Sequence, residues 1–127
     1  MSRAKILYIE DNPDNMTLVK RVLEIEDYEV ISAETGQLGL IKAFESLPDI
    51  VITDINLPDI DGYQITDTLK KDQRTAHIPV IAMTANVMEK HKMEIAQAGC
   101  DGFIPKPINV DELPLQMENF LKGVFAS

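Results

Sequence analysis

The middle of the chain carries the run Ile50-Val51-Ile52-Thr53-Asp54, in which apolar, mostly β-branched residues lead directly to a carboxylate. Such runs are typical of strands buried on both faces of a parallel sheet. Asp54 is therefore expected at the carboxyl end of a buried strand, where an unpaired charge is costly. A carboxylate at that place indicates a partner cation, a bound metal ion or a chemical role.

Three further strand-like runs end in residues that could serve the same site. Ile6-Leu7-Tyr8-Ile9 is followed by Glu10 and Asp11, Val80-Ile81-Ala82-Met83 by Thr84, and the short Phe103-Ile104 by Pro105 and Lys106. In an open parallel sheet, ligands bind outside the carboxyl ends of the strands. If these runs are parallel neighbours, three acids, one hydroxyl and one amine share a pocket.

The apolar periodicity indicates five strands that alternate with five helices. The predicted strands cover residues 5–10, 28–33, 49–54, 79–84 and 102–104. The predicted helices begin at Pro13 behind an Asn12 cap, after Gly36 and at Gly62, cover residues 87–98, and follow a final apolar stripe over residues 110–124. This α/β alternation predicts a doubly wound parallel sheet, and the flavodoxin-like strand order 2-1-3-4-5 is favoured.

The last helix contains two conflicting signals. Asn109 and Glu112 have the spacing of a capping box, which would start the helix just after Asn109. Pro114 would then lie too deep in the helix. Either the helix starts later or its first turn is irregular.

Length and charge limit the functions that are open to the chain. Its 127 residues are the usual size of one domain. With 12 basic and 21 acidic residues the net charge is -9. The sequence contains no Lys/Arg cluster, so direct DNA binding is not expected. No apolar stretch reaches membrane-spanning length, so membrane insertion is not expected. The one cysteine, Cys100, cannot form an internal disulfide, which favours a reducing, cytoplasmic location.

The strand ends, taken together, resemble a known family. Glu10-Asp11, Asp54 within Asp-Ile-Asn-Leu-Pro-Asp-Ile-Asp-Gly, Thr84-Ala85 and Lys106-Pro107 are similar to the receiver domain of bacterial two-component response regulators, the CheY-like superfamily. The similarity to single-domain regulators of the chemotaxis and DivK-type cell-polarity kinds leads us to expect one receiver domain over residues 1–127 and no output domain. A receiver domain cut from a hybrid kinase or a larger regulator stays open.

The resemblance implies a role for each acid. Asp54 would accept a phosphoryl group from the phosphohistidine of a sensor histidine kinase or a histidine phosphotransfer protein. Glu10, Asp11, Asp54 and the backbone carbonyl of Asn56 would bind Mg²⁺, which takes oxygen ligands and relieves the repulsion between carboxylates.

The resemblance also implies a switch. Thr84 would hydrogen-bond one phosphoryl oxygen and Lys106, before a cis peptide bond to Pro107, would pair with another. Phe103 would then turn inward, which would change the face made by residues 87–98, the last strand and the last helix. That face would bind a downstream protein, which the sequence does not identify, or support onward phosphotransfer.

Other interpretations compete with this one. A phosphohydrolase of the haloacid dehalogenase kind would need a second aspartate where Asn56 stands, so we expect no enzyme beyond slow self-dephosphorylation. A flavodoxin-like cofactor carrier would need a hydroxyl- and glycine-rich loop in place of residues 11–14, and a degenerate receiver would lack part of the site. Taken singly, Glu10 and Asp11 suit an ordinary helix-entry acid pair as well as they suit a site. His77 and His91 lack the spacing of metal ligands and are interpreted as surface residues.

Overall fold

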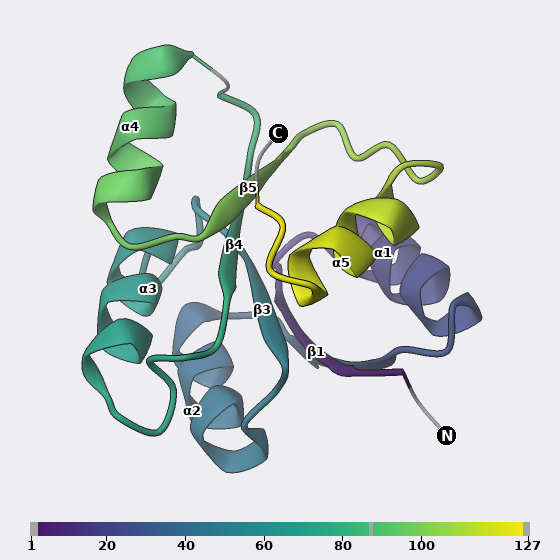
Figure 1. Ribbon diagram of the computed structural model, residues 1–127, viewed down its shortest axis with the longest axis horizontal. Coiled ribbons are helices and arrows are strands. Elements are labelled where there is room, and N and C mark those ends of the chain that lie inside the picture. The colour runs from purple at the N-terminus through teal and green to yellow at the C-terminus, as the bar shows by residue number, and fades with distance from the viewer. Residues whose placement is uncertain (1–2, 87, 126–127) are drawn as a thin grey trace.

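A computed structural model describes residues 3–86 and 88–125 as a five-stranded parallel sheet with helices on both faces (Figure 1). The strands are β1 (Lys5–Ile9), β2 (Glu29–Ala33), β3 (Ile50–Asp54), β4 (Val80–Thr84) and β5 (Gly102–Pro105). The helices are α1 (Pro13–Ile25), α2 (Gly36–Ser46), α3 (Gly62–Lys71), α4 (Glu89–Gln97) and α5 (Leu113–Leu121). The strand order is β2-β1-β3-β4-β5, which confirms the predicted flavodoxin-like fold.

The predicted boundaries are close to the observed ones. Each predicted strand differs from the observed strand by one residue at one end. The helix predicted over residues 87–98 is observed from Glu89 to Gln97, and Val87 lies outside the described residues. The Asn12 cap is confirmed, because its side chain accepts hydrogen bonds from the N–H groups of Asp14 and Asn15.

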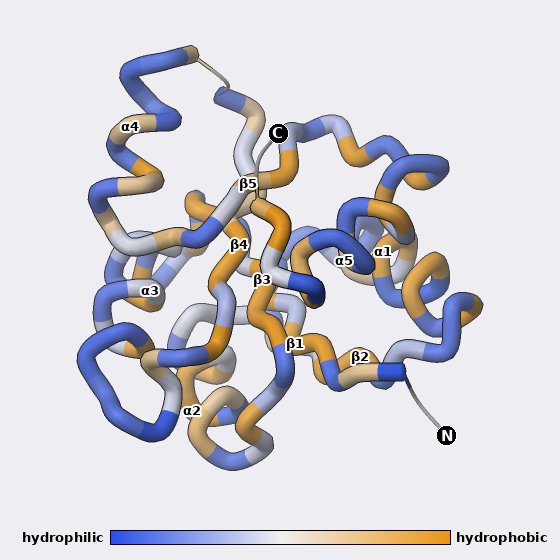
Figure 2. The backbone as a smooth tube through the Cα atoms, in the orientation of Figure 1, coloured by the Kyte–Doolittle hydropathy of each residue, from blue (hydrophilic) through white to orange (hydrophobic). Residues whose placement is uncertain are grey.

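The strands divide their side chains between two apolar clusters. In β1, Ile6 and Tyr8 belong to the cluster under α1 and α5, whereas Leu7 and Ile9 belong to the cluster under α2 and α3. All four are fully buried, as the period of two in a strand covered on both faces requires. Figure 2 shows apolar strands at the centre, whereas the surrounding helices carry a mixture of polar and apolar residues.

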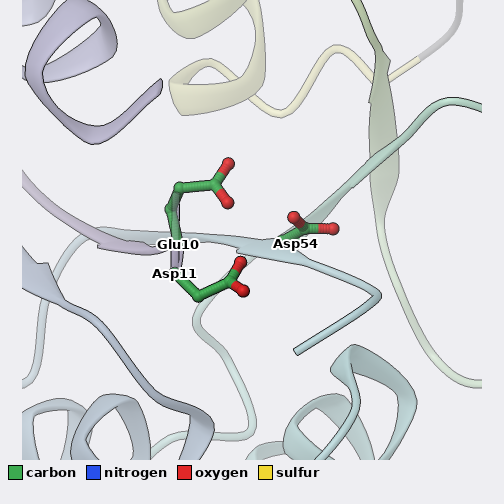
Figure 3. Close-up of side chains that lie close together, drawn as sticks. All are labelled: Glu10, Asp11 and Asp54. Carbon is green, nitrogen blue, oxygen red and sulfur yellow. The ribbon is translucent and has the colours of Figure 1, made fainter. Parts of the chain in front are cut away.

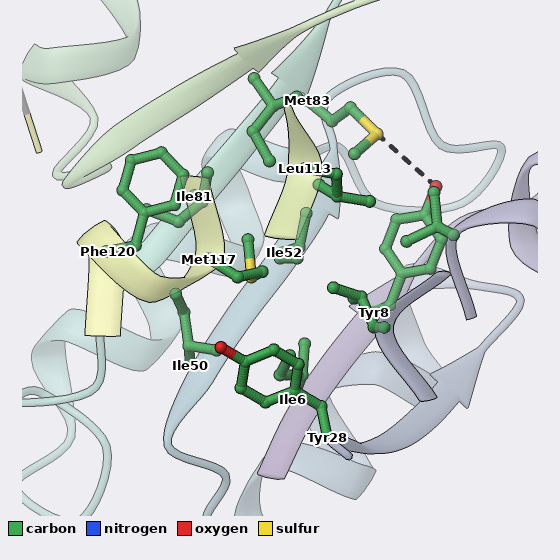
Figure 4. Close-up of a cluster of buried hydrophobic side chains, with 13 residues drawn as sticks. Ile6, Tyr8, Tyr28, Ile50, Ile52, Ile81, Met83, Leu113, Met117 and Phe120 are labelled. Carbon is green, nitrogen blue, oxygen red and sulfur yellow. Dashed lines mark hydrogen bonds between the residues drawn. The ribbon is translucent and has the colours of Figure 1, made fainter. Parts of the chain in front are cut away.

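The cluster under α5 shows how the last helix is held on the sheet. Leu113, Met117 and Phe120 point from α5 toward the isoleucines of the strands, among them Ile50 and Ile81 (Figure 4). Full burial of each such side chain contributes about 1.5–3 kcal/mol. The predicted apolar stripe of this segment is therefore the buried face of the helix.

Helix α5 starts later than the capping signal predicts. It begins at Leu113, and Pro114 occupies its first turn, where a missing N–H leaves no helical bond unmade. The Asn109 side chain instead accepts a hydrogen bond from the Asp111 N–H (3.0 Å) and closes a short turn. Glu112 makes no side-chain cap, so the predicted capping box is wrong and the later start is confirmed.

The second half of the loop after β3 is held by two carboxylates. Asp59 accepts hydrogen bonds from the N–H groups of Gly36 (2.8 Å) and Gln37 (2.9 Å) at the start of α2. Asp61 caps α3 by accepting from the Gln64 N–H (2.9 Å). The loop that follows Asp54 is therefore tied to two helices.

Helix α4 is anchored at its C-terminal end through the turn that follows it. Asp101, in that turn, accepts a hydrogen bond from the Val80 N–H (2.8 Å). The same carboxylate oxygen lies 2.8 Å from Nζ of Lys70 in α3, which also donates to the Ile78 carbonyl (2.9 Å). The turn is thus joined to α3 and to the start of β4.

Within residues 3–86 and 88–125, the helices fall short of the length and apolarity that crossing a bilayer requires.

Gly62 packs directly on the end of β3. A Cβ atom at this position would lie 2.9 Å from the Asp54 carbonyl oxygen and 2.9 Å from the Ile55 Cα, both of which are backbone atoms. The Gly62 N–H donates to the Ile55 carbonyl (2.9 Å). The start of α3 therefore sets the position of the main chain that carries Asp54.

We expect Gly62→Ala to lower the free energy of unfolding by about 1–3 kcal/mol, because the added methyl group meets backbone that cannot rotate away. Urea denaturation measures this difference. Gln64→Ala, on the exposed side of the same helix, is the matched control and is expected to stay within about 0.5 kcal/mol of the wild type. Equal stability of the two variants would contradict the close packing described for Gly62.

Candidate acidic metal site

Three carboxylates lie together at the carboxyl ends of β1 and β3. Glu10, Asp11 and Asp54 each offer one oxygen such that all three lie within 4.8 Å of one another (Figure 3). Glu10 is 1% and Asp54 6% exposed, whereas Asp11 is exposed to solvent. Two of the three like charges are therefore shielded from water, which strengthens their repulsion.

Lys106 supplies the nearest positive charge. Its Nζ lies 2.7 Å from Asp54 Oδ2 and 3.2 Å from Glu10 Oε1. The Lys106 N–H donates to the Thr84 carbonyl (2.7 Å), which places the residue directly beyond β5. The peptide bond to Pro107 is cis, as the family resemblance implied. The amine and the acids therefore share one pocket, as their places at the strand ends predict.

The Glu10 carboxylate also accepts hydrogen bonds from β1, from the loop that follows it and from α1. The Tyr8 hydroxyl donates to Oε1 (2.9 Å), the Asn12 N–H to Oε2 (3.3 Å), and Asn15 Nδ2 to Oε1 (3.4 Å). Sequence reasoning treated Tyr8 only as a strand residue. The available signal was its position two residues before Glu10, which puts both side chains on the same side of the extended chain.

The site shifts the proton affinities of its members in a consistent direction. Burial, followed by the charge of Asp54, raises the pKa of Glu10, although Asn12, Lys106 and Tyr8 act against this. Burial alone would lower the pKa of Lys106, but the hydrogen bond and charge of Asp54, together with Glu10, outweigh it and raise that pKa. Burial and then the Glu10 charge also raise the pKa of the Tyr8 hydroxyl. The single ammonium of Lys106 therefore does not fully balance the negative charge of the carboxylates in the pocket.

Both oxygens of the Asp54 carboxylate are engaged. Oδ1 accepts a hydrogen bond from the Asn56 N–H (3.1 Å), and Oδ2 faces Lys106. These contacts fix the orientation of a carboxylate that lies at the end of a fully buried strand. The Asn56 carbonyl as a metal ligand stays a prediction.

Thr84 lies at the end of β4, buried, with its hydroxyl turned toward α4. Its Oγ1 accepts a hydrogen bond from the Asn86 N–H (3.0 Å) and lies 3.1 Å from His91 Nε2. His91 Nδ1 in turn lies 3.3 Å from the Tyr63 hydroxyl. The interpretation of His91 as a surface residue is wrong, since its side chain is only 16% exposed; His77 is exposed as expected. No local pattern around His91 indicated this contact, because its partners come from β4 and α3.

Phe103 lies in β5, paired in register with Ala82. It is partly buried and packs against the small cluster of Ile55, Ala82 and Ile95. Lys92 of α4 lies over its ring, 5.4 Å from the centroid. Its proposed movement on activation, like the contact of Thr84 with a phosphoryl oxygen, stays a prediction.

The donors of this pocket fit a hard divalent cation. They are carboxylate oxygens from three residues, and Asp11 keeps one side of the cluster open to water. Mg²⁺ prefers oxygen ligands and retains several of its own waters, and a divalent charge would offset the repulsion that raises the pKa of Glu10.

Comparison with known proteins agrees with the fold. Residues 6–118 match the family model described as the response regulator receiver domain. The chain is 38% identical over 116 residues to the polar-differentiation response regulator DivK of Brucella ovis, covering 91% of this chain and 94% of that protein.

Two solved structures are similar throughout. The chemotaxis response regulator CheY4 of Vibrio cholerae has a TM-score of 0.87 at 26% identity, over 91% of this chain and 97% of that one. The receiver domain of the sensor histidine kinase PA1611 from Pseudomonas aeruginosa PAO1 has a TM-score of 0.86 at 28% identity, over 94% of this chain and 98% of that one. That structure has a magnesium ion coordinated in its active site cleft.

The raised pKa of Glu10 predicts how stability depends on pH without a divalent cation. The folded state holds the Glu10 proton more tightly than the unfolded chain does, where the pKa is about 4.3. The contribution of Glu10 to the free energy of unfolding therefore falls as pH rises from about 4.3 through the raised pKa.

In Glu10→Gln this fall is absent, so we expect the variant to be more stable than the wild type near neutral pH in EDTA. The difference should shrink as pH falls toward the ordinary pKa of glutamate, about 4.3. Urea denaturation across that range measures it, with Asp14→Asn, an exposed acid of α1, as control. Adding Mg²⁺ should stabilise the wild type more than Glu10→Gln. A variant that is less stable than the wild type at every pH would contradict the repulsion described for this pocket.

Proposed function

This chain belongs to the response regulator receiver domain family, and we propose that Asp54 is the residue on which it accepts a phosphoryl group. Members of this family act in two-component signal transduction. The observation that carries the proposal is the pairing of Asp54 with Lys106 (2.7 Å) beside two further acids at the same sheet edge. A buried carboxylate held in this way has both a fixed orientation and a nearby cation.

The proposed reaction is an in-line phosphoryl transfer. An Asp54 oxygen attacks the phosphorus of a phosphohistidine, a P–O bond forms, and the P–N bond breaks with its electron pair left on the imidazole of the donor. The product is an acyl phosphate. Lys106, already in contact with Asp54 Oδ2, would pair with a phosphoryl oxygen as negative charge moves onto the residue. The protein contributes positioning and electrostatic stabilisation rather than covalent chemistry.

We propose that Glu10, Asp11 and Asp54, with the Asn56 carbonyl, hold Mg²⁺ in this site. The clustered carboxylates support this choice of ligands. When bound, the ion would neutralise charge on the transferring phosphoryl group. Without it, Lys106 has to balance two buried acids.

The donor is proposed to be a sensor histidine kinase or a histidine phosphotransfer protein. A groove of about 400 Å³ beside Lys106 is lined by Asn15 and Leu18 of α1 and by Ala85, Pro107 and Ile108 of the neighbouring loops, which leaves space for a partner surface. A cytoplasmic location is part of the proposal, and the free thiol of Cys100 is in keeping with a reducing compartment.

Two alternatives are kept as outcomes of the test. The similarity to the receiver domain of a sensor histidine kinase supports the reading of this chain as a receiver from a hybrid kinase, while the similarity to DivK supports a single-domain regulator over residues 1–127. A phosphohydrolase is less favoured, because Asn56 at the second position after Asp54 carries no acid. We propose a phosphoacceptor that turns over no added substrate.

The test is incubation with acetyl phosphate and Mg²⁺, followed by mass spectrometry of the intact protein. We expect an adduct of about 80 Da, the mass of one phosphoryl group, that is lost in Asp54→Asn. Asp11→Asn keeps Asp54 but removes an exposed ligand, so its adduct should need more Mg²⁺ to form. Lys106→Gln should slow adduct formation.

Controls separate this result from the alternatives. Asp67→Asn, at an exposed acid of α3, should give the wild-type adduct. Turnover of phosphate esters without an adduct would favour the hydrolase. An adduct that survives in Asp54→Asn would overturn the assignment of the phosphoacceptor.

A further inference from the structure

His91 joins three elements of the fold through its two ring nitrogens. From α4, its Nε2 lies 3.1 Å from Thr84 Oγ1 at the end of β4, and its Nδ1 lies 3.3 Å from the Tyr63 hydroxyl of α3. The ring of Tyr63 meets the imidazole edge-on, with the centroids 6.3 Å apart. Both nitrogens of this largely buried imidazole therefore contact groups outside α4.

The neighbours of His91 indicate where its proton lies. Nδ1 faces the Tyr63 hydroxyl and, at 3.6 Å, a carboxylate oxygen of Glu94, which can only accept when ionised. Because the Glu94 carboxylate attracts a proton on Nδ1 and the Tyr63 oxygen can accept it, we infer that Nδ1 carries the proton and Nε2 is the acceptor. Thr84 can then donate its hydroxyl proton to Nε2 (3.1 Å), which lies closer than its other acceptor, the Asn86 carbonyl (3.5 Å). The Thr84 oxygen accepts from the Asn86 N–H (3.0 Å).

This arrangement conflicts with the proposed role of Thr84. A phosphoryl oxygen on Asp54 can only accept a hydrogen bond, so Thr84 must donate to it. The hydroxyl has one proton, and it cannot serve His91 Nε2 and the phosphoryl group together. One of the two bonds exists in each state of the protein.

We propose that His91 is a positioning residue that holds the Thr84 hydroxyl in the unphosphorylated protein, so that phosphorylation of Asp54 breaks the Thr84–His91 hydrogen bond and releases the N-terminal half of α4. The inference rests on the proposed function of Asp54. Competition for one proton gives the two states the differential interaction that a switch requires.

The rest of α4 is held weakly, which makes this bond important for its position. Among its nine residues, all of which the structure describes, Ile95 is the one that is fully buried. Met88 at its N-cap makes no side-chain capping bond. Lys92, next to His91, lies over the ring of Phe103. Adjacent residues of α4 thus touch both residues of the proposed switch, Thr84 and Phe103.

The test uses the presence of only two histidines in the sequence. Protein labelled with ¹⁵N-histidine is studied by NMR at about pH 8, where an ordinary imidazole is neutral, and His77→Gln assigns the two rings. Mg²⁺ and beryllofluoride, a stable mimic of the phosphoryl group, are then added. We expect the His91 Nε2 resonance to shift in the same direction as in unliganded Thr84→Val, which lacks the proton, while the His77 ring stays unchanged.

Binding of beryllofluoride gives a second readout. His91→Phe keeps an aromatic ring against Tyr63 but removes the acceptor, so we expect about fivefold tighter binding, the change that corresponds to one ordinary hydrogen bond. His91→Gln retains an acceptor and should lie closer to the wild type. Tyr63→Phe, which removes the partner of Nδ1 only, is the matched control. Thermal unfolding checks that each variant is folded.

The outcomes separate this inference from the function on which it rests. Absence of the acetyl phosphate adduct would end the proposed function. A normal adduct, with an unchanged His91 resonance or with folded His91→Phe binding beryllofluoride no more tightly than the wild type, would overturn the role of His91 alone.

Discussion

The charge balance between one ammonium group and two buried carboxylates determines what the site at the sheet edge can bind. Lys106 contacts both Asp54 and Glu10, and removing this shared ammonium would leave buried carboxylates without a partner, which typically costs about 3–5 kcal/mol. The balance is incomplete, because the pKa of Glu10 remains raised. The excess of negative charge favours binding of a divalent cation. Because the fold itself brings the carboxylates together, the site is preorganised for that cation.

The parallel sheet makes this concentration of charge possible. Strands β1, β3 and β4 are apolar and almost completely buried, so polar groups are confined to the points where the strands end. Because the strands run in the same direction, those points meet at one edge. The apolar clusters on the two faces of the sheet fix the strands relative to one another. The tight packing of Gly62 against the Asp54 main chain also makes the position of Asp54 depend on that of α3.

The sequence predicted the features that depend on continuous or local patterns. Apolar runs located the strands to within a residue, and the residues that follow them indicated which side chains would meet. Contacts between distant segments left no such signal. Asp59 bonds to Gly36, 23 residues away, and His91 bonds to a hydroxyl on a strand and to a phenol on another helix. The start of α5 was ambiguous because Asn109 suits a turn as well as a cap, and Pro114 decides between the two.

The ion pair between Lys70 and Asp101 has a consequence for how this molecule can move. It fastens the C-terminal end of α4 to α3 and to the start of β4, at the opposite edge of the sheet from the acids. A helix that is held at its C-terminal end pivots about that end when its other contacts change. Loss of the His91–Thr84 contact near the other end would then shift the exposed face of α4, while the contacts of Asp101 with Val80 and Lys70 are kept.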